Sequence, residues 1–232
     1  MVSGRGSGIL PRVIPFALYM AFIAIEEALH FFDQHGLVHL QDKSLLFLYP
    51  VKIVCVGLAL LLYGPQYSEL RARDMLKSTH TFAAVLTGLA VFVLWINMTW
   101  DFATFGNPVG YSPMKIESLS LRYAFISSRL LGAVVVVPVM EELFWRSFMI
   151  RYVIDPEFLK VPLGQFTWSS FLIIAVLFGL EHNLWLAGMM AGATYNVIFY
   201  YTRSIGQCIL SHAVTNLALG VYVLNTGQWK FW

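Results

Sequence analysis

Seven apolar runs, most of them long enough to cross a membrane, recur along this chain of 232 residues. A membrane-spanning helix needs roughly 20 apolar residues, with a range of about 17–25, and the fourth to sixth runs are at or below the short end. Only helices and closed barrels satisfy their backbone groups in lipid, and these runs do not alternate as barrel strands do. We therefore expect an all-α, polytopic transmembrane helix bundle. The runs are Ile9–Ala28, Leu45–Tyr63, Phe82–Trp100, Ala124–Met140, Phe171–Trp185, Ala187–Tyr201 and Ile205–Leu224.

The number of helices is seven, or eight if Glu141–Ile154 forms a helix separate from the fourth run. The connections are short, so we predict a single integral membrane domain over residues 1–232, with a motif-bearing core over 122–224. The first run follows Arg5, has no small-residue cleavage signal at its end and precedes further spans. It is therefore interpreted as a signal anchor.

Composition excludes several other classes of protein. Charged residues make up 12% of the chain, about half the usual share of a soluble domain. The apolar share of 58% argues against disorder, and two cysteines cannot build a disulfide scaffold. A net charge of +2 makes nucleic acid an unexpected partner, whereas membrane lipid is an expected one.

Positive charges are unequally shared between the two sides of a seven-helix bundle. The side that holds the N-terminus carries eight lysine and arginine residues, and the other side carries four. Because these residues are enriched in cytoplasmic loops, the difference favours a cytoplasmic N-terminus. The compact chain is typical of a bacterial protein, so we expect it in the bacterial inner membrane. One side carries Arg5, Arg12, Arg71, Arg73, Lys77, Arg151, Lys160 and Arg203, and the other carries Lys43, Lys115, Arg122 and Lys230.

The densest group of ionisable residues inside an apolar segment is Glu141-Glu142-Leu143-Phe144-Trp145-Arg146. Glu142 and Arg146 lie four residues apart, on one helical face, and can pair. Glu141 points about 100° away from Glu142. This geometry separates a structural carboxylate from a reactive one. The alternative is a buried ion pair that only holds helices together.

Two further pairs of residues, each with a histidine, lie in later apolar runs. Phe178 and His182 are one helical turn apart, as are His212 and Asn216. His182 is either part of a site or an ordinary interfacial residue, and His212 with Asn216 is either a pair of donors or a bridge between membrane helices.

The depths of these residues along their helices agree. Counted from the polar stretch 155–165 at about 1.5 Å per residue, Glu141 lies roughly 20 Å away and His182 roughly 25 Å away. Counted from Arg203, His212 and Asn216 lie roughly 13 Å and 20 Å deep. Polar side chains from three helices can therefore meet near the middle of the membrane.

The three motifs, in this order, resemble the CPBP family of intramembrane glutamic endopeptidases, the CAAX-protease and bacteriocin-processing type. They extend from residue 141 to residue 216, about a third of the chain. The resemblance implies that Glu141 and His182 activate a water, that Glu142 and Arg146 form a supporting pair, and that His212 and Asn216 form an oxyanion hole. Glu181 departs from the pattern, since a small or apolar residue is expected beside His182.

Amide hydrolysis agrees with this residue set, because it needs a base for water, donors for the oxyanion and a proton for the leaving amine. We favour a mechanism without a cofactor. A zinc-dependent form stays open, with Glu141, His182 and His212 as the ligands, since two imidazoles and a carboxylate form a known catalytic zinc set.

Two other features of the sequence are interpreted as structural. Glu26-Glu27-x-x-His30 imitates an acid–histidine motif, and Lys52 and Arg129 are candidate counter-ions for its carboxylates. Cys55 and Cys208 lie in apolar stretches and are expected to be small packing residues.

The leading hypothesis is an intramembrane endopeptidase of the CAAX-protease type that cuts a membrane-anchored peptide or protein substrate. The alternative is a non-enzymatic membrane protein on the same scaffold, such as an immunity, chaperone-like or transport component.

Overall fold

The computed structural model describes residues 8–38, 47–106, 110 and 112–231, and its regular structure there is helical, without strands. The prediction of an all-α bundle is confirmed. Arg5, Lys43 and the predicted start of the second run at Leu45 lie outside the described residues. Within the described residues the seven helices are α1 (Leu10–Gln34), α3 (Leu48–Tyr63), α4 (Ser78–Asn97), a fourth helical segment (Leu119–Tyr152), α8 (Trp168–Leu180), α9 (Trp185–Thr202) and α10 (Ile205–Thr226).

Five of these helices are long and apolar enough to cross a membrane, namely Leu10–Gln34, Leu48–Gln66, Ser78–Asn97, Leu119–Tyr152 and Ile205–Thr226. Helix α8 is shorter, with 13 residues. At 1.5 Å per residue it is about 20 Å long, less than the roughly 30 Å of a bilayer's hydrocarbon core. Helix α8 by itself is therefore too short to cross that core.

The fourth segment settles whether Glu141–Ile154 forms a separate helix. It is one helical segment that contains α5 (Leu119–Leu131), α6 (Val137–Glu142) and α7 (Ile150–Tyr152), so the helix continues past the predicted end at Met140. Two π-helical stretches interrupt the α-helical pattern, at Gly132–Val136 and Leu143–Met149. Such stretches occur frequently at functional sites. The second one begins directly after the two adjacent glutamates.

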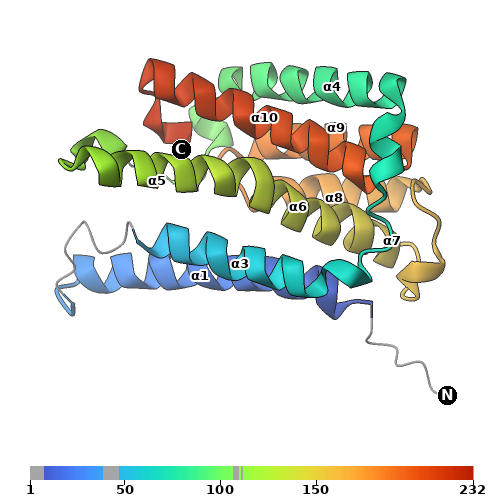
Figure 1. Cartoon of the computed structure of the whole chain (residues 1–232), viewed down its shortest axis with the longest axis horizontal. Coiled ribbons are helices and arrows are strands. Elements are labelled where there is room, and N and C mark those ends of the chain that lie inside the picture. The colour runs from blue at the N-terminus through green and yellow to red at the C-terminus, as the bar shows by residue number, and fades with distance from the viewer. Residues whose placement is uncertain (1–7, 39–46, 107–109, 111, 232) are drawn as a thin grey trace. The chain divides into compact units, whose positions relative to one another are not determined.

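The chain divides into two compact units, and each is described by itself. Unit 1 contains Met1–Tyr67 and Pro113–Met140. Within it, α1 packs along α3 (Figure 1). Lys52 lies 3.8 Å from Glu26 and 4.6 Å from the centre of the Tyr19 ring, so the predicted counter-ion role of Lys52 has a partner in Glu26.

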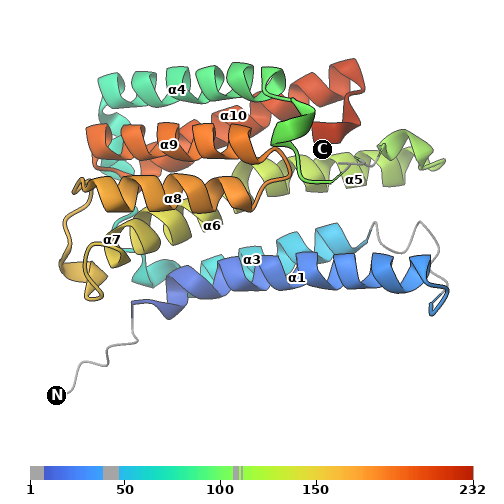
Figure 2. The same ribbon diagram turned by 180° about the vertical axis from the view of Figure 1, so that it is seen from behind.

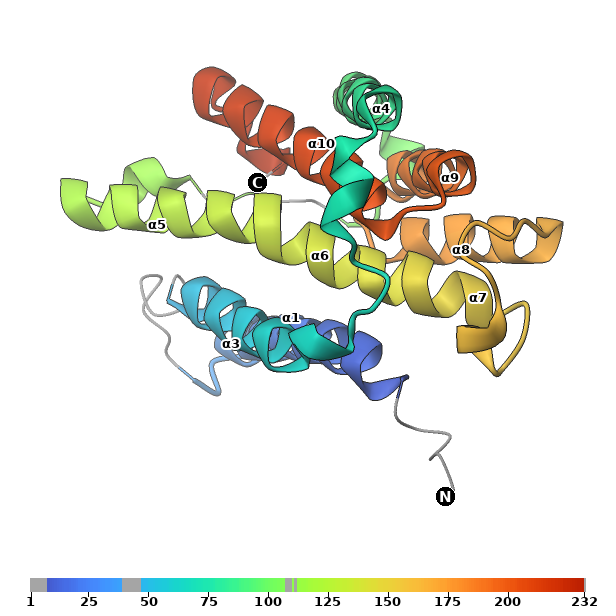
Figure 3. The ribbon, with the colours of Figure 1, turned by 45° about the vertical axis from the view of Figure 1, so that its right-hand side comes forward.

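Unit 2 contains Ser68–Ser112 and Glu141–Trp232. Helices α8 and α9 run side by side in it (Figure 2), and α10 packs against α4, which Figure 3 shows nearly end-on. Glycines permit both contacts. A Cβ atom on Gly188 of α9 would lie 2.9 Å from Cα of Gly179 on α8, and one on Gly88 of α4 would lie 2.3 Å from the Ser211 carbonyl oxygen on α10. Small residues let membrane helices approach closely. That the two units form a single membrane domain stays a prediction.

The start of α10 is held by its own cap. Ser204 Oγ accepts a hydrogen bond from the backbone N–H of Gln207 at 3.4 Å, as an N-cap residue does. The same hydroxyl donates to Asp74 Oδ2 at 2.9 Å. These contacts fix the helical register that places His212 two turns into α10.

Candidate active site

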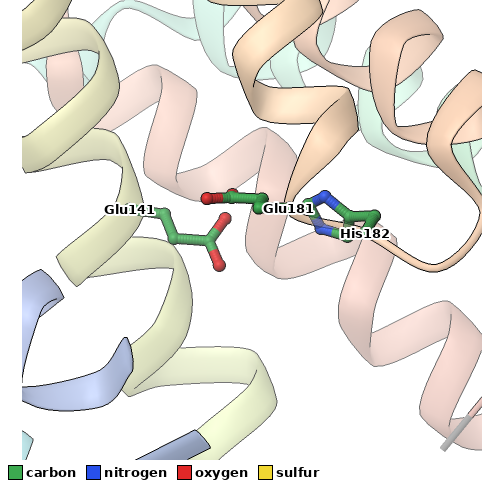
Figure 4. A group of neighbouring side chains, drawn as sticks. All are labelled: Glu141, Glu181 and His182. Carbon is green, nitrogen blue, oxygen red and sulfur yellow. The ribbon is translucent and has the colours of Figure 1, made fainter. Parts of the chain in front are cut away.

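Two carboxylates and an imidazole gather where α8 ends. Glu141 comes from α6, and Glu181 and His182 directly follow α8. Figure 4 shows the carboxylates of Glu141 and Glu181 pointing into the same space, with the His182 ring beside them. One nitrogen or oxygen atom from each of the three residues lies within 4.8 Å of the other two. Among the described residues, the buried Oε2 atoms of Glu141 and Glu181 have no hydrogen-bond partner.

The neighbouring Glu142 faces a different set of residues. It is completely buried, and its Oε1 accepts a hydrogen bond from Nη1 of Arg146 at 3.2 Å. Arg146 also donates to Asn196 Oδ1 at 3.2 Å and to the Gly192 carbonyl at 3.0 Å, both on α9. The guanidinium lies 4.6 Å from the centre of the Phe178 ring. Arg146 therefore joins its own helix to α9 and neutralises Glu142.

His212 reaches the same carboxylate from α10. Its Nδ1 lies 3.0 Å from Glu142 Oε1, and its ring stacks on Tyr195 with centres 4.9 Å apart. Tyr195 donates in turn to Thr215 Oγ1 at 2.8 Å. Because a carboxylate accepts, the Nδ1 atom of His212 carries the hydrogen of this bond.

His182 is held by the last turn of α8. Its Nδ1 lies 2.7 Å from the Phe178 carbonyl oxygen, which can only accept, so Nδ1 is the donor. The neutral ring then has a free lone pair on Nε2. Phe178 lies against the ring at 4.9 Å and Trp95 at 5.3 Å, which restricts the access of water.

The remaining predicted residue, Asn216, lies one turn after His212 on α10 and is half-buried. The structure thus brings Glu141 to His182, and Glu142 and Arg146 to His212.

The segment after α4 covers the turn that carries His182. The backbone N–H of Phe105 donates to the Asn183 carbonyl oxygen at 2.7 Å, and the Phe105 ring lies 6.2 Å from that of Trp185. Ala103, in the same segment, is buried.

Two residues of the candidate active site lie outside the set of site residues predicted from the sequence, namely Glu181 and Asn196. Glu181 takes the place beside Glu141 and His182 that the zinc-dependent alternative gave to His212. Its Oε1 accepts a hydrogen bond from Nε1 of Trp145 at 3.2 Å. Asn196, fully buried, is the second. The sequence could have indicated Glu181, because this residue is adjacent to His182. Asn196 is a lone amide in an apolar run, and no sequence pattern indicates it.

Comparison with known proteins bears on this arrangement. Residues 123–218 match the family model described as type II CAAX prenyl endopeptidase Rce1-like. This segment of the chain is similar to the Rce1-like family. The resemblance expected from the three motifs is confirmed, and all six predicted site residues lie inside the matched segment of the Rce1-like model. No curated protein and no solved structure gives a significant match.

Proposed function

We propose that the chain is an intramembrane endopeptidase that hydrolyses a peptide bond of a membrane-associated substrate. One observation carries the proposal, the Glu141 carboxylate lying close to His182 in a largely buried cluster. The Rce1-like match over residues 123–218 supports the reaction class. The long apolar helices support an integral membrane location. The compactness of the chain leads us to assign it to a bacterial inner membrane.

In the proposed mechanism, Glu141 and Nε2 of His182 hold a water between them. Glu141 takes a proton from this water as the oxygen attacks the substrate carbonyl carbon. The same proton then passes to the amine nitrogen, the C–N bond breaks, and Glu141 is again a carboxylate. Glu142 does not compete for this role, since Arg146 neutralises it.

His212 and Asn216 are proposed to bind the oxyanion. A protonated His212 donates from Nδ1 to Glu142 and has its Nε2–H left for the substrate oxygen. Asn216 supplies an amide N–H from the next turn of α10. One such donor is worth about 10²–10³-fold in kcat.

The test uses the full chain in lipid nanodiscs and a panel of membrane-anchored peptides that includes a prenylated CAAX peptide, with products measured by mass spectrometry. Glu141→Gln should abolish cleavage and leave the thermal unfolding midpoint unchanged. The control is Glu157→Gln, an exposed carboxylate before α8. Equal cleavage by the wild type and Glu141→Gln would overturn the proposal. Unchanged cellular function in Glu141→Gln and His182→Ala would favour a non-enzymatic role.

A zinc-dependent form of this hydrolase is the second candidate, and the cluster in Figure 4 is the observation that favours it. Glu141, Glu181 and His182 are of the residue types that hold catalytic zinc, and a bound ion would supply a Lewis acid. Activity that survives exhaustive chelation supports the metal-free mechanism. Loss of activity on chelation, restored by zinc, supports the zinc-dependent form.

A further inference from the structure

A basic pocket of about 450 Å³ lies in unit 2 and shares no residue with the candidate active site. Its volume is in the range of small-molecule sites, about 300–1,000 Å³. Three segments build it: the chain from Arg71 to the start of α4, the loop before α8, and the end of α9. Its charged and titratable lining residues are Arg71, Arg73, Asp74, Lys77, His80 and Arg203.

Positive charge dominates this lining, with four cations and one carboxylate. The carboxylate of Asp74 is already engaged by Ser204, and the Asp74 backbone carbonyl accepts from Gln207 Nε2 at 2.8 Å. Asp74 therefore braces the start of α10. Arg71, Arg73, Lys77 and Arg203 are exposed, and none of them forms an ion pair with a carboxylate in the part of the chain that the structure describes.

Arg203 has an unusual backbone for an arginine. It ends α9 in the left-handed conformation, with φ 53° and ψ 34°, and no other non-glycine residue in the described ranges has a positive φ. Glycine is the usual residue at such a position, because a Cβ atom makes this conformation costly. Gly164 leaves room for the side chain, since a Cβ atom there would lie 2.6 Å from Arg203 Cγ. The chain thus keeps a guanidinium where folding alone favours glycine.

The pocket lies at the ends of apolar helices. Helices α4 and α10 are long and apolar enough to cross a membrane, and they begin at Ser78 and Ile205, so the cations lie at the level of the ends of two candidate membrane spans. Phospholipid phosphates lie at that level of a bilayer, and basic pockets between helices bind anionic headgroups. Arginine suits this ligand, because its planar fork pairs two N–H groups with phosphate oxygens.

We propose that the basic pocket binds a phosphate-bearing anion, with a phospholipid headgroup as its source. The Arg203 guanidinium and the cations of residues 71–77 bind the phosphate together, from two separate segments that line the pocket. Tyr201, an exposed lining residue, contacts the less polar part of the ligand.

The test measures the thermal unfolding midpoint of the full chain in a neutral detergent. Phosphatidylglycerol, phosphatidylcholine and inorganic phosphate are titrated separately. Phosphatidylglycerol should raise the midpoint at low concentration, and phosphatidylcholine should not. Each removed cation should weaken the apparent affinity about fivefold, the size expected for one Lys or Arg at an anionic surface. If inorganic phosphate raises the midpoint as much as phosphatidylglycerol does at the same concentration, the pocket is a phosphate site whose ligand is a soluble phosphate and not a lipid headgroup.

Arg203→Gly separates binding from folding. Glycine relieves the left-handed conformation, so this variant should unfold at the same or a higher temperature without lipid, yet respond less to phosphatidylglycerol. Arg203→Lys keeps the positive charge, and its response to phosphatidylglycerol should lie between those of the wild type and Arg203→Gly. Lys160→Gln, an exposed cation outside the pocket, should respond as the wild type does. An unchanged lipid response in both Arg203→Gly and the combined Arg71→Gln, Arg73→Gln and Lys77→Gln variant would overturn the proposal.

Discussion

Nδ1 of His212 lies 3.0 Å from Oε1 of Glu142, the oxygen that also accepts from Arg146. One buried carboxylate oxygen therefore links α10 to the helix that carries Glu141. The position of His212 relative to Glu141 depends on this contact, because adjacent glutamates share one backbone segment.

Removal of His212 tests its proposed role as an oxyanion donor. His212→Ala should lower kcat about 10²–10³-fold with a smaller effect on KM, since the donor acts on charge that develops in the transition state. Steady-state cleavage of a peptide found to be a substrate measures both constants. Asn225→Ala, an exposed residue near the end of α10, is the control and should retain wild-type kcat. A His212→Ala enzyme with normal kcat would remove this residue from the mechanism.

Arg146 should matter more for stability than any other predicted site residue. Arg146→Ala leaves Glu142 buried without its cation, and breaking such a pair costs about 3–5 kcal/mol in free energy of unfolding. Denaturant unfolding in detergent measures this loss. The double variant Arg146→Ala, Glu142→Gln should be less destabilised than Arg146→Ala alone, because the carboxylate that lost its arginine is replaced by a neutral amide. If the double variant is instead the less stable of the two, the ion pair with Glu142 is not the reason that Arg146 stabilises the protein.

Glu181 separates the metal-free mechanism from the zinc-dependent one. Glu181→Gln keeps an oxygen that can accept from Trp145 and removes one carboxyl group from the cluster. In the metal-free mechanism, we expect kcat to stay within about tenfold, since Glu181 is not the base. Metal content, measured by elemental analysis of the purified protein, should be negligible in both proteins. Zinc at one ion per chain in the wild type, lost in Glu181→Gln, would instead identify Glu181 as a ligand.

The contact of Gly88 with α10 predicts a sensitive position on α4. A Cβ atom there would meet the Ser211 carbonyl oxygen at 2.3 Å, so Gly88→Ala should cost about 1–3 kcal/mol of stability through overpacking. It should also lower activity, because Ser211 adjoins His212. Gly57→Ala on α3 meets nothing within 4 Å and should instead stabilise its helix by up to about 1 kcal/mol. Unfolding midpoints of the two variants should therefore move in opposite directions.

The helical class and the positions of most helices could be predicted from apolar run length alone. Whether the fourth helix continues past Met140 could not be predicted, because Glu141, Glu142 and Arg146 look like a polar boundary. Glu142 and Arg146 neutralise each other inside the protein, so the helix continues through them.

The different surroundings of the two glutamates were also predictable, since a rotation of 100° per residue sends adjacent side chains to different neighbours. The identity of those neighbours was only partly predictable. Asn196 hydrogen-bonds Arg146 from a helix fifty residues further along the chain, and no local pattern marks it. Glu181 lies beside Glu141 because α8 ends at Leu180. The sequence of α8 is uniformly apolar and does not indicate where the helix ends.

The hydrogen bond from Phe105 to Asn183 joins the segment after α4 to the turn that carries His182. In the proposed mechanism, a substrate that approached the cluster across this turn would first have to displace that segment. An extended chain terminus would need less displacement than a folded domain.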